Sequence, residues 1–187
     1  MTRTVYYTAT TLDGFLADEH DSLDWLLSQP LDEGGMLDHD EFIGGIGALL
    51  MGATTYQWVL DHGARTGDPW AYEQPTWVMT HRDLPPAAEN VTIASGDVRA
   101  VHAAMVEAAA GRDVWVVGGG DLAGQLADAG LLDEVLVSIA PVVLGAGRPL
   151  LPRRLDLRLT SHGRNGAFLC ATYDVVGPLA ASAGTDA

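Results

Sequence analysis

Lysine is absent from this chain of 187 residues, and cysteine occurs once. All ten basic residues are therefore arginine, and against 25 acidic residues they give a formal charge of 10 − 25 = −15. The single cysteine, Cys170, excludes an internal disulfide and any metal site built from several cysteines. Scattered arginines argue against a general nucleic-acid binder, because phosphate backbones require clustered basic side chains. An anionic ligand would have to be held locally, by helix N-termini, backbone amides and a few placed arginines.

Long hydrophobic runs are also missing. No stretch reaches eighteen uninterrupted apolar residues, so we expect no transmembrane helix and no membrane partner. The first residues lack the charged and apolar regions of a secretory signal, which favours a cytoplasmic protein. The abundance of alanine, glycine and arginine without lysine suggests a bacterial source with a GC-rich genome. The length predicts a single domain over residues 1–177, followed by a small, polar tail at 178–187 that we expect to be disordered.

Strand-like and helix-like segments alternate along most of the chain. Strands are predicted at 5–11, 48–51, 76–80, 91–94, 113–117 and 132–140, and as a closing hairpin at 155–161 and 167–176. Helices are predicted at 23–28, 38–46, 56–61, 97–110 and 121–129. This order predicts an α/β fold with a central, mostly parallel mixed sheet flanked by helices and a C-terminal antiparallel hairpin. The Gly-containing loops at 29–37 and 62–74 are candidates for lids.

The most informative run is Val116–Leu122, in which a buried strand ends in three glycines and a helix follows. Glycines let a phosphate approach the backbone, and the helix N-terminus offers free amide donors with a partial positive charge. The alternative is a tight turn that needs one glycine with positive φ. Three successive glycines, Gly118, Gly119 and Gly120, favour a ligand over a turn.

A second run, Leu50–Tyr56, has the same order of strand, glycine and helix. Taken alone, Thr54 or Thr55 could simply be the N-cap of that helix. Two such helix starts in one small sheet favour the interpretation that both face one extended anion. The third candidate is Arg82, which follows a strand directly; it is either a phosphate ligand at an adenosine ribose or a solvated loop arginine.

Catalytic side chains are less clearly marked. Asp13 and Asp24 are the acids nearest the turns around the first strand, and each is either a catalytic acid or an ordinary turn or cap residue. Trp25 and Phe42 are candidate apolar walls for a substrate, although a tryptophan is more often part of a core. The six histidines show no metal-ligand spacing, so we predict no metal site.

These motifs, in this order, resemble the dihydrofolate-reductase-like superfamily, and in particular the C-terminal reductase domain of the riboflavin-biosynthesis protein RibD and its stand-alone relatives. The matching segments are ATTLDGFLA at 9–17, LLMGATTY at 49–56, WVMTHRDLP at 77–85, VWVVGGGDLAGQL at 114–126 and DEVLVSIAPVVLGAGRPLL at 133–151. The resemblance covers roughly residues 3–176. It implies an NADPH-dependent reductase, often a homodimer, that transfers hydride to a small pteridine-, pyrimidine-, carbonyl- or imine-type substrate.

The resemblance also implies a set of cofactor-binding residues. Backbone groups of Ala9 and Leu16 would border the nicotinamide carboxamide. The adenosine ribose would lie by Thr80, His81 and Arg82. The diphosphate would be held by two helix starts, consisting of Gly52, Thr54, Thr55, Gly118, Gly119, Gly120, Asp121 and Leu122. Asp13 matches the acid of the family's Leu-Asp-Gly turn beside the substrate, and Asp24 is a loose positional match to the active-site carboxylate of dihydrofolate reductases.

Two departures from the family pattern bear on function. Ala53 stands where dihydrofolate reductases commonly carry an arginine, so the preference for NADPH rests on Arg82. Residues 22–48 contain no arginine or lysine, whereas RibD reductases use arginines in this segment to grip a ribose phosphate. The alternative function is therefore a non-catalytic module that binds NADPH, flavin or another nucleotide. A third option is a doubly wound NAD dehydrogenase, against which the lack of a Gly-x-Gly-x-x-Gly run after the first strand argues.

Overall fold

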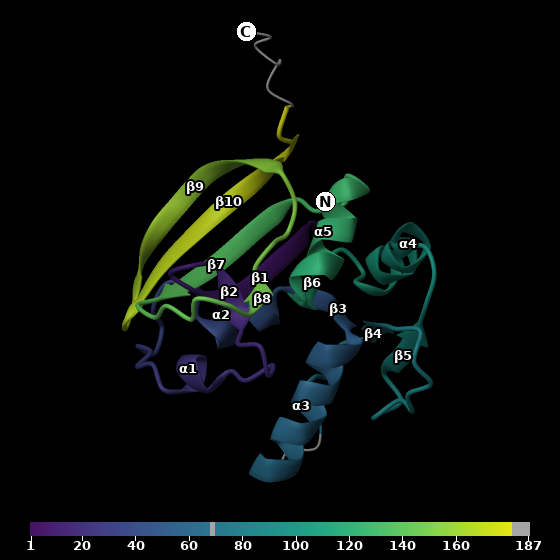
Figure 1. The fold of residues 1–187 in the computed structure, drawn as a ribbon. Coiled ribbons are helices and arrows are strands. Elements are labelled where there is room, and N and C mark those ends of the chain that lie inside the picture. The colour runs from purple at the N-terminus through teal and green to yellow at the C-terminus, as the bar shows by residue number, and fades with distance from the viewer. Residues whose placement is uncertain (68–69, 181–187) are drawn as a thin grey trace, which may run out of the picture.

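The computed structural model describes residues 1–67 and 70–180, which form an eight-stranded sheet with helices on both faces (Figure 1). In chain order the strands of this sheet are β1 (Thr4–Thr11), β3 (Ile46–Gly52), β4 (Thr76–Met79), β5 (Val91–Ala94), β6 (Asp113–Gly118), β7 (Glu134–Ala140), β9 (Leu155–Asn165) and β10 (Phe168–Pro178). Across the sheet the order is β5-β4-β3-β6-β1-β7-β10-β9. All pairs from β5 to β7 are parallel, and β10 is antiparallel to both of its neighbours. The predicted fold class is confirmed.

Five helices cover the two faces of the sheet. They are α1 (Asp24–Leu27), α2 (His39–Gly44), α3 (Ala53–Thr66), α4 (Val98–Ala108) and α5 (Gly120–Asp128). Helices α4 and α5 pack on one face, while α2 and α3 pack on the other together with α1. A separate two-stranded sheet pairs β2 (Phe15–Ala17) with β8 (Arg148–Pro149).

Strand β3 shows how the sequence builds this core. Its residues are almost all apolar because both of its faces are covered. Ala48 and Leu50 face the cluster formed with α4 and α5, whereas Leu49 and Met51 face the clusters formed with α2 and α3. Since β3 and β6 are parallel neighbours, their carboxyl ends lie together at one edge of the sheet. That edge is where both glycine-containing helix starts emerge.

Most boundaries differ from the expectations by one to three residues, and two elements, α3 and β9, differ by more. Helix α3 begins at Ala53 and runs to Thr66, so it takes up the first part of the expected loop at 62–74. It ends at Gly67, whose left-handed φ of 86° provides the C-cap. The hairpin turn is shorter than expected, because β9 continues through Asn165. In this turn Gly166 takes a positive φ of 55°. Of the expected tail, Pro178 is the last residue of β10, and 181–187 lie outside the described residues.

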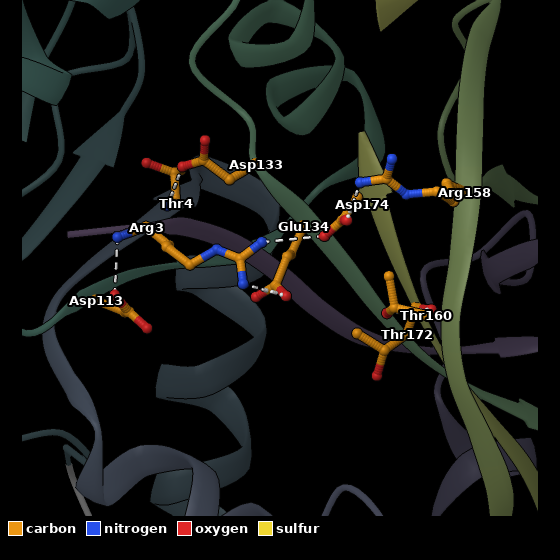
Figure 2. A network of polar contacts seen from close by, with 9 residues as sticks. All are labelled: Arg3, Thr4, Asp113, Asp133, Glu134, Arg158, Thr160, Thr172 and Asp174. Atoms are coloured by element: carbon orange, nitrogen blue, oxygen red, sulfur yellow. Dashed lines mark hydrogen bonds and ion pairs between the residues drawn. The ribbon is translucent and has the colours of Figure 1, made fainter. Parts of the chain in front are cut away.

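The opposite edge of the sheet is held by a charged network around Arg3 (Figure 2). The Arg3 guanidinium lies 2.6 Å from a carboxylate oxygen of Glu134 and 3.1 Å from one of Asp174. The backbone N–H groups of Arg3 and Thr4 donate to the side chains of Asp113 and Asp133 at 2.8 and 2.7 Å. The Arg3 guanidinium thus links the start of β7 to β10, and the backbone N–H groups of Arg3 and Thr4 link the start of β1 to the starts of β6 and β7.

Replacing Arg3 with alanine is expected to lower Tm by about 2–4 °C at pH 7, through loss of a partly buried ion pair with Glu134. Burial raises the pKa of Glu134, and Arg3 opposes that rise. Without Arg3 the ionised carboxylate is uncompensated, so the loss of stability should shrink as pH falls and Glu134 becomes protonated. Thermal unfolding at pH 7 and pH 4.5 tests this, with the exposed Arg112→Ala as control. An equal loss at both pH values would contradict it.

If a family-like homodimer forms, the apolar segment 135–144 is our candidate for its contact, but part of that segment is the interior strand β7. Strand β7 is paired with β1 on one side and β10 on the other, so its edges are occupied. One face of it, with Val135, Val137 and Ile139, lines a shallow apolar hollow of about 400 Å³. The homodimer therefore stays a prediction, and it would have to use a sheet face. In residues 1–67 and 70–180, no helix has the length and apolar character needed to cross a membrane.

Candidate functional site

A large cavity of about 1190 Å³ lies at the carboxyl edge of the parallel strands. Every residue expected to contact the cofactor lines it. These residues are Ala9, Leu16, Gly52, Thr54, Thr55, Thr80, His81, Arg82, Gly118, Gly119, Gly120, Asp121 and Leu122. They come from the ends of β1, β3, β4 and β6 and from β2, α3 and α5, which the strand order brings together. The volume is at the upper end of that of cofactor and ligand pockets.

The two glycine-containing helix starts converge inside this cavity. A methyl group built on Gly52 would lie 3.9 Å from the carbonyl oxygen of Gly118 and from the nitrogen of Gly119. A methyl group on Gly118 would meet the Thr55 hydroxyl at 3.0 Å. Gly52 and Gly119 are the N-caps of α3 and α5, and neither helix has a side-chain cap. Both helices therefore leave their first amide donors free, an arrangement that suits an anion bridging the two starts.

The three glycines at the end of β6 and the start of α5 differ in what surrounds them. None of them has a positive φ, so the alternative of a turn that needs a glycine with positive φ does not apply. A methyl group on Gly120 would overlap the carbonyl oxygens of Pro149 and Leu150. A methyl group on Gly119 would meet nothing within 4 Å. Packing thus explains Gly120, whereas Gly119 adjoins open space in the cavity lining.

The end of β4 supplies a cation to the cavity. The Thr80 hydroxyl accepts a hydrogen bond of 2.9 Å from the backbone N–H of Arg82. Arg82 is exposed, and its guanidinium makes no ion pair or hydrogen bond with any described residue. Ser95 and Gly96, at the end of β5, line the cavity beside it. A free guanidinium at this end fits a phosphate group on a ribose.

Thr54, Thr55 and Asp121 lie in the first turns of the two helices. The N-cap of α3 is Gly52, so neither threonine caps the helix. The Asp121 carboxylate accepts hydrogen bonds from Gln125 and Arg153, which lower its pKa. With that carboxylate occupied and negative, the group that Asp121 offers to an anion is its backbone N–H.

The predicted catalytic acids are not brought to the cavity. Neither Asp13 nor Asp24 is among the described residues that line it. The Asp13 carboxylate accepts hydrogen bonds from the Thr11 hydroxyl at 2.6 Å and from the Gly145 N–H at 2.7 Å, so it ties two loops together. Asp24 is exposed in the first turn of the four-residue helix α1. This geometry fits the alternative stated from the sequence, in which Asp13 is an ordinary turn residue and Asp24 lies at a helix end.

Replacing Asp13 with asparagine should lower Tm near neutral pH. The hydrogen bond from Thr11, followed by those from Gly145 and Leu144, lowers the pKa of Asp13. A carboxyl group whose pKa is lowered on folding stabilises the protein above its unfolded pKa of about 3.9, and that contribution is lost as pH falls through the folded pKa. The Tm difference between wild type and variant should therefore be present at pH 6 and disappear near pH 2–3.

Asp24→Asn is the matched control for this prediction. It removes the same charge from an exposed side chain that accepts no hydrogen bond from a described residue. Its Tm should match that of the wild type at every pH. A pH-independent Tm difference in Asp13→Asn, or an equal loss in Asp24→Asn, would contradict the loop-anchoring role.

The predicted substrate walls lie one layer behind the cavity. Phe42 packs on Tyr7 and Trp115, with ring centroids 4.3 and 5.4 Å apart, and it is these two rings that line the cavity. Trp25 packs in a cluster with Phe168, which also lines the cavity. Sequence reasoning missed Tyr7, Trp115 and Phe168. Tyr7 could have been predicted from the sequence, because it lies two residues before Ala9 on β1 and every second residue of a strand points to the same face.

The loop at 29–37 and the start of α2 close the remaining side. Leu31, Asp32, Glu33 and Leu37 line the cavity from the loop. Asp38, the N-cap of α2, lines it too, and hydrogen bonds from the backbone N–H groups of Glu41, Gly34 and Asp40 lower its pKa. The loop at 29–37, a candidate lid from the sequence, thus borders the cavity. Within the described part of the chain, no three His, Cys, Asp or Glu side chains are grouped to hold a metal ion.

The order of strands and the position of this cavity define a dihydrofolate-reductase-like fold. A dihydrofolate reductase from Enterococcus faecalis, solved with NADP(H), superposes with a TM-score of 0.55 at 14% identity, over 93% of this chain and 96% of that one. A crystal structure from Shewanella sp. PV-4, named after riboflavin biosynthesis, superposes with a TM-score of 0.78 at 24% identity, over 93% and 99%.

Sequence comparison identifies the family within this fold. The model of the RibD C-terminal domain matches residues 4–167, and the chain belongs to that family. The uncharacterized protein YwjB of Bacillus subtilis is 30% identical over 175 residues, which cover 91% of this chain and 97% of YwjB. The resemblance stated from the motifs alone is therefore confirmed at the level of family and fold.

Proposed function

We propose that this protein is an NADPH-dependent reductase of a small organic acceptor. The observation that carries the proposal is the convergence of two uncapped helix N-termini on one cavity, beside the guanidinium of Arg82, which has no partner among the described residues. In a chain of formal charge −15, these groups are suited to hold a dinucleotide with an additional phosphate. The complex of the Enterococcus faecalis enzyme with NADP(H) supports the same choice of cofactor.

The residues present fit NADPH in three places. Gly119 leaves open space where a diphosphate would approach the backbone, and the first amides of α3 and α5 face that space. Arg82 and the end of β5 would hold the phosphorylated adenosine ribose. Ala9 and Leu16 would border the nicotinamide, next to the rings of Tyr7 and Trp115.

When bound, NADPH supplies a hydride to the acceptor carbon, and one proton added to the neighbouring atom completes the two-electron reduction. The chain's own residues position the two reactants. Burial raises the pKa of Tyr7 to about 12, and its hydroxyl already donates to the Leu37 carbonyl at 2.7 Å. Asp38 is held ionised by backbone donors. Neither group is suited to release a proton, so we infer that water entering the open cavity supplies it.

Two measurements test the proposal. Calorimetry should show binding of NADPH and weaker binding of NADH. Absorbance at 340 nm should then fall when dihydrofolate or a member of a panel of carbonyl and imine compounds is added. No heat with either coenzyme would overturn the proposal. NADPH binding without oxidation across the panel would support the alternative, a cofactor-binding module without turnover.

A further inference from the structure

The part of the cavity beyond the expected cofactor residues is bounded by aromatic rings and carboxylates. Tyr7, Trp115 and Phe168 form its walls from the sheet. The opposite side comes from the loop at 29–37 and from α2. We refer to this part as the acceptor end, since it adjoins Ala9 and Leu16. Flat rings on one side fit a planar, ring-shaped acceptor.

Four carboxylates line the acceptor end: Asp32, Glu33, Asp38 and Asp40. Two of them are fixed in place by the backbone. Asp32 accepts from the Gly166 N–H at 3.0 Å, and Asp38 accepts from the first turn of α2. Their charges therefore cannot move away from a ligand without breaking the anchor of the loop or the cap of the helix.

Nothing positive balances these charges within the described lining of the acceptor end, apart from the histidine ring of His39. The lining contains two arginines. Arg82 lies at the far end, after β4, and Arg148 is held by Asp21 through two hydrogen bonds of 2.6 and 3.0 Å. His39 itself lies 3.6 Å from Asp40. Under the proposed function, the phosphates of a bound cofactor would add further negative charge.

We propose that the acceptor carries no phosphate or carboxylate and is a neutral or cationic ring, such as an amino-substituted heterocycle or a protonated imine. That the ligand is a hydride acceptor rests on the proposed function, whereas the charge preference of this part of the cavity does not. A cluster of like charges repels an anionic ligand, whereas a cation gains both from the carboxylates and from the aromatic faces.

The potential at the acceptor end is measured with a cysteine introduced as Leu31→Cys. Leu31 lines the cavity and is 62% exposed, while the native Cys170 is fully buried. Modification rates are compared for cationic and anionic methanethiosulfonate reagents of similar size. The control is Leu159→Cys on β9, where Leu159 is 51% exposed. Its rate ratio measures the effect of the protein's overall charge. We expect the cationic-to-anionic rate ratio at position 31 to exceed that at position 159 by about tenfold or more. A ratio within about twofold of the control would overturn the proposal.

A paired substitution assigns the effect to the lining carboxylates. In the Leu31→Cys background, Glu33→Gln with Asp40→Asn should lower the ratio by about threefold or more. Glu107→Gln with Asp156→Asn removes the same charge from exposed residues outside the described lining and should leave the ratio unchanged. Equal effects of the two pairs would overturn the assignment.

Binding by the protein saturated with NADPH gives the second readout. The probes are 5-amino-6-ribosylaminouracil and its 5′-phosphate, which differ only in the phosphate. The phosphorylated compound should bind at least about tenfold more weakly, or not at all. Equal or tighter binding of the phosphorylated compound would overturn the inference. Failure of NADPH itself to bind would remove the proposed function, whereas the thiol reactivities would still decide the charge preference.

Discussion

Gly119→Ala is expected to weaken NADPH binding by about 10- to 100-fold without changing Tm. The added methyl group meets no described atom within 4 Å outside residues 118–120, so we expect the fold to accommodate it. It would instead project toward the space where we place the diphosphate and hold the phosphates away from the free amides of α5. Loss of one or two hydrogen bonds to a charged group corresponds to an affinity change of this size. Calorimetric titration together with thermal unfolding measures both quantities.

Gly120→Ala is the contrasting variant, one residue further along the chain. Its methyl group would overlap the backbone carbonyls of Pro149 and Leu150, which cannot rotate away as a side chain can. We expect it to lower the free energy of unfolding by about 1–3 kcal/mol. If Gly119→Ala also lowered Tm, or bound NADPH as tightly as the wild type, the diphosphate site would be misplaced.

Arg82→Gln is expected to weaken NADPH binding by about 10- to 100-fold and to leave NADH binding unchanged. The two coenzymes differ only in the 2′-phosphate, and a charge-assisted hydrogen bond to a phosphate accounts for a change of this size. Arg82 is suited to this role because its guanidinium has no partner among the described residues. The selectivity should rest on it, since Ala53 supplies no cation at the start of α3.

The control for Arg82→Gln is Arg112→Gln, which makes the same change of charge at an exposed residue outside the described cavity lining. It should leave both dissociation constants unaltered. A parallel loss of NADPH and NADH affinity in Arg82→Gln would mean that the arginine contacts a part shared by both coenzymes. The position of the adenosine ribose would then have to be revised.

Much of the fold could be predicted because its strands and helices follow from local sequence patterns. The apolar run of β6, the glycine-terminated strands and the final hairpin were recognisable. The boundaries that were missed have local causes too. Helix α3 runs past the expected end because Gly67 provides its cap after Thr66. Strand β9 continues through Gly163 because that residue pairs with Cys170 in the ladder.

The lining of the cavity was predicted where backbone groups define it and less well where side chains do. The glycine motifs and Arg82 follow strand ends directly, and parallel strands deliver their carboxyl ends to one edge. Asp13, Asp24, Trp25 and Phe42 lie in turns and short helices, where the direction of a side chain depends on tertiary contacts. Asp13 turns to the amides of residues 144–145, and Phe42 turns behind Tyr7.

The sequence by itself determined the order of most strands and helices along the chain, the two glycine-containing helix starts and the absence of arginine and lysine from residues 22–48, because each depends on neighbours in the chain. Only the tertiary structure decided that Gly52 lies beside Gly118 and that Tyr7, Trp115 and Phe168 share a cavity with Asp32 and Asp38. These residues are far apart in the chain, and only the pairing of β3 with β6 and of β1 with β7 brings them within reach of one ligand.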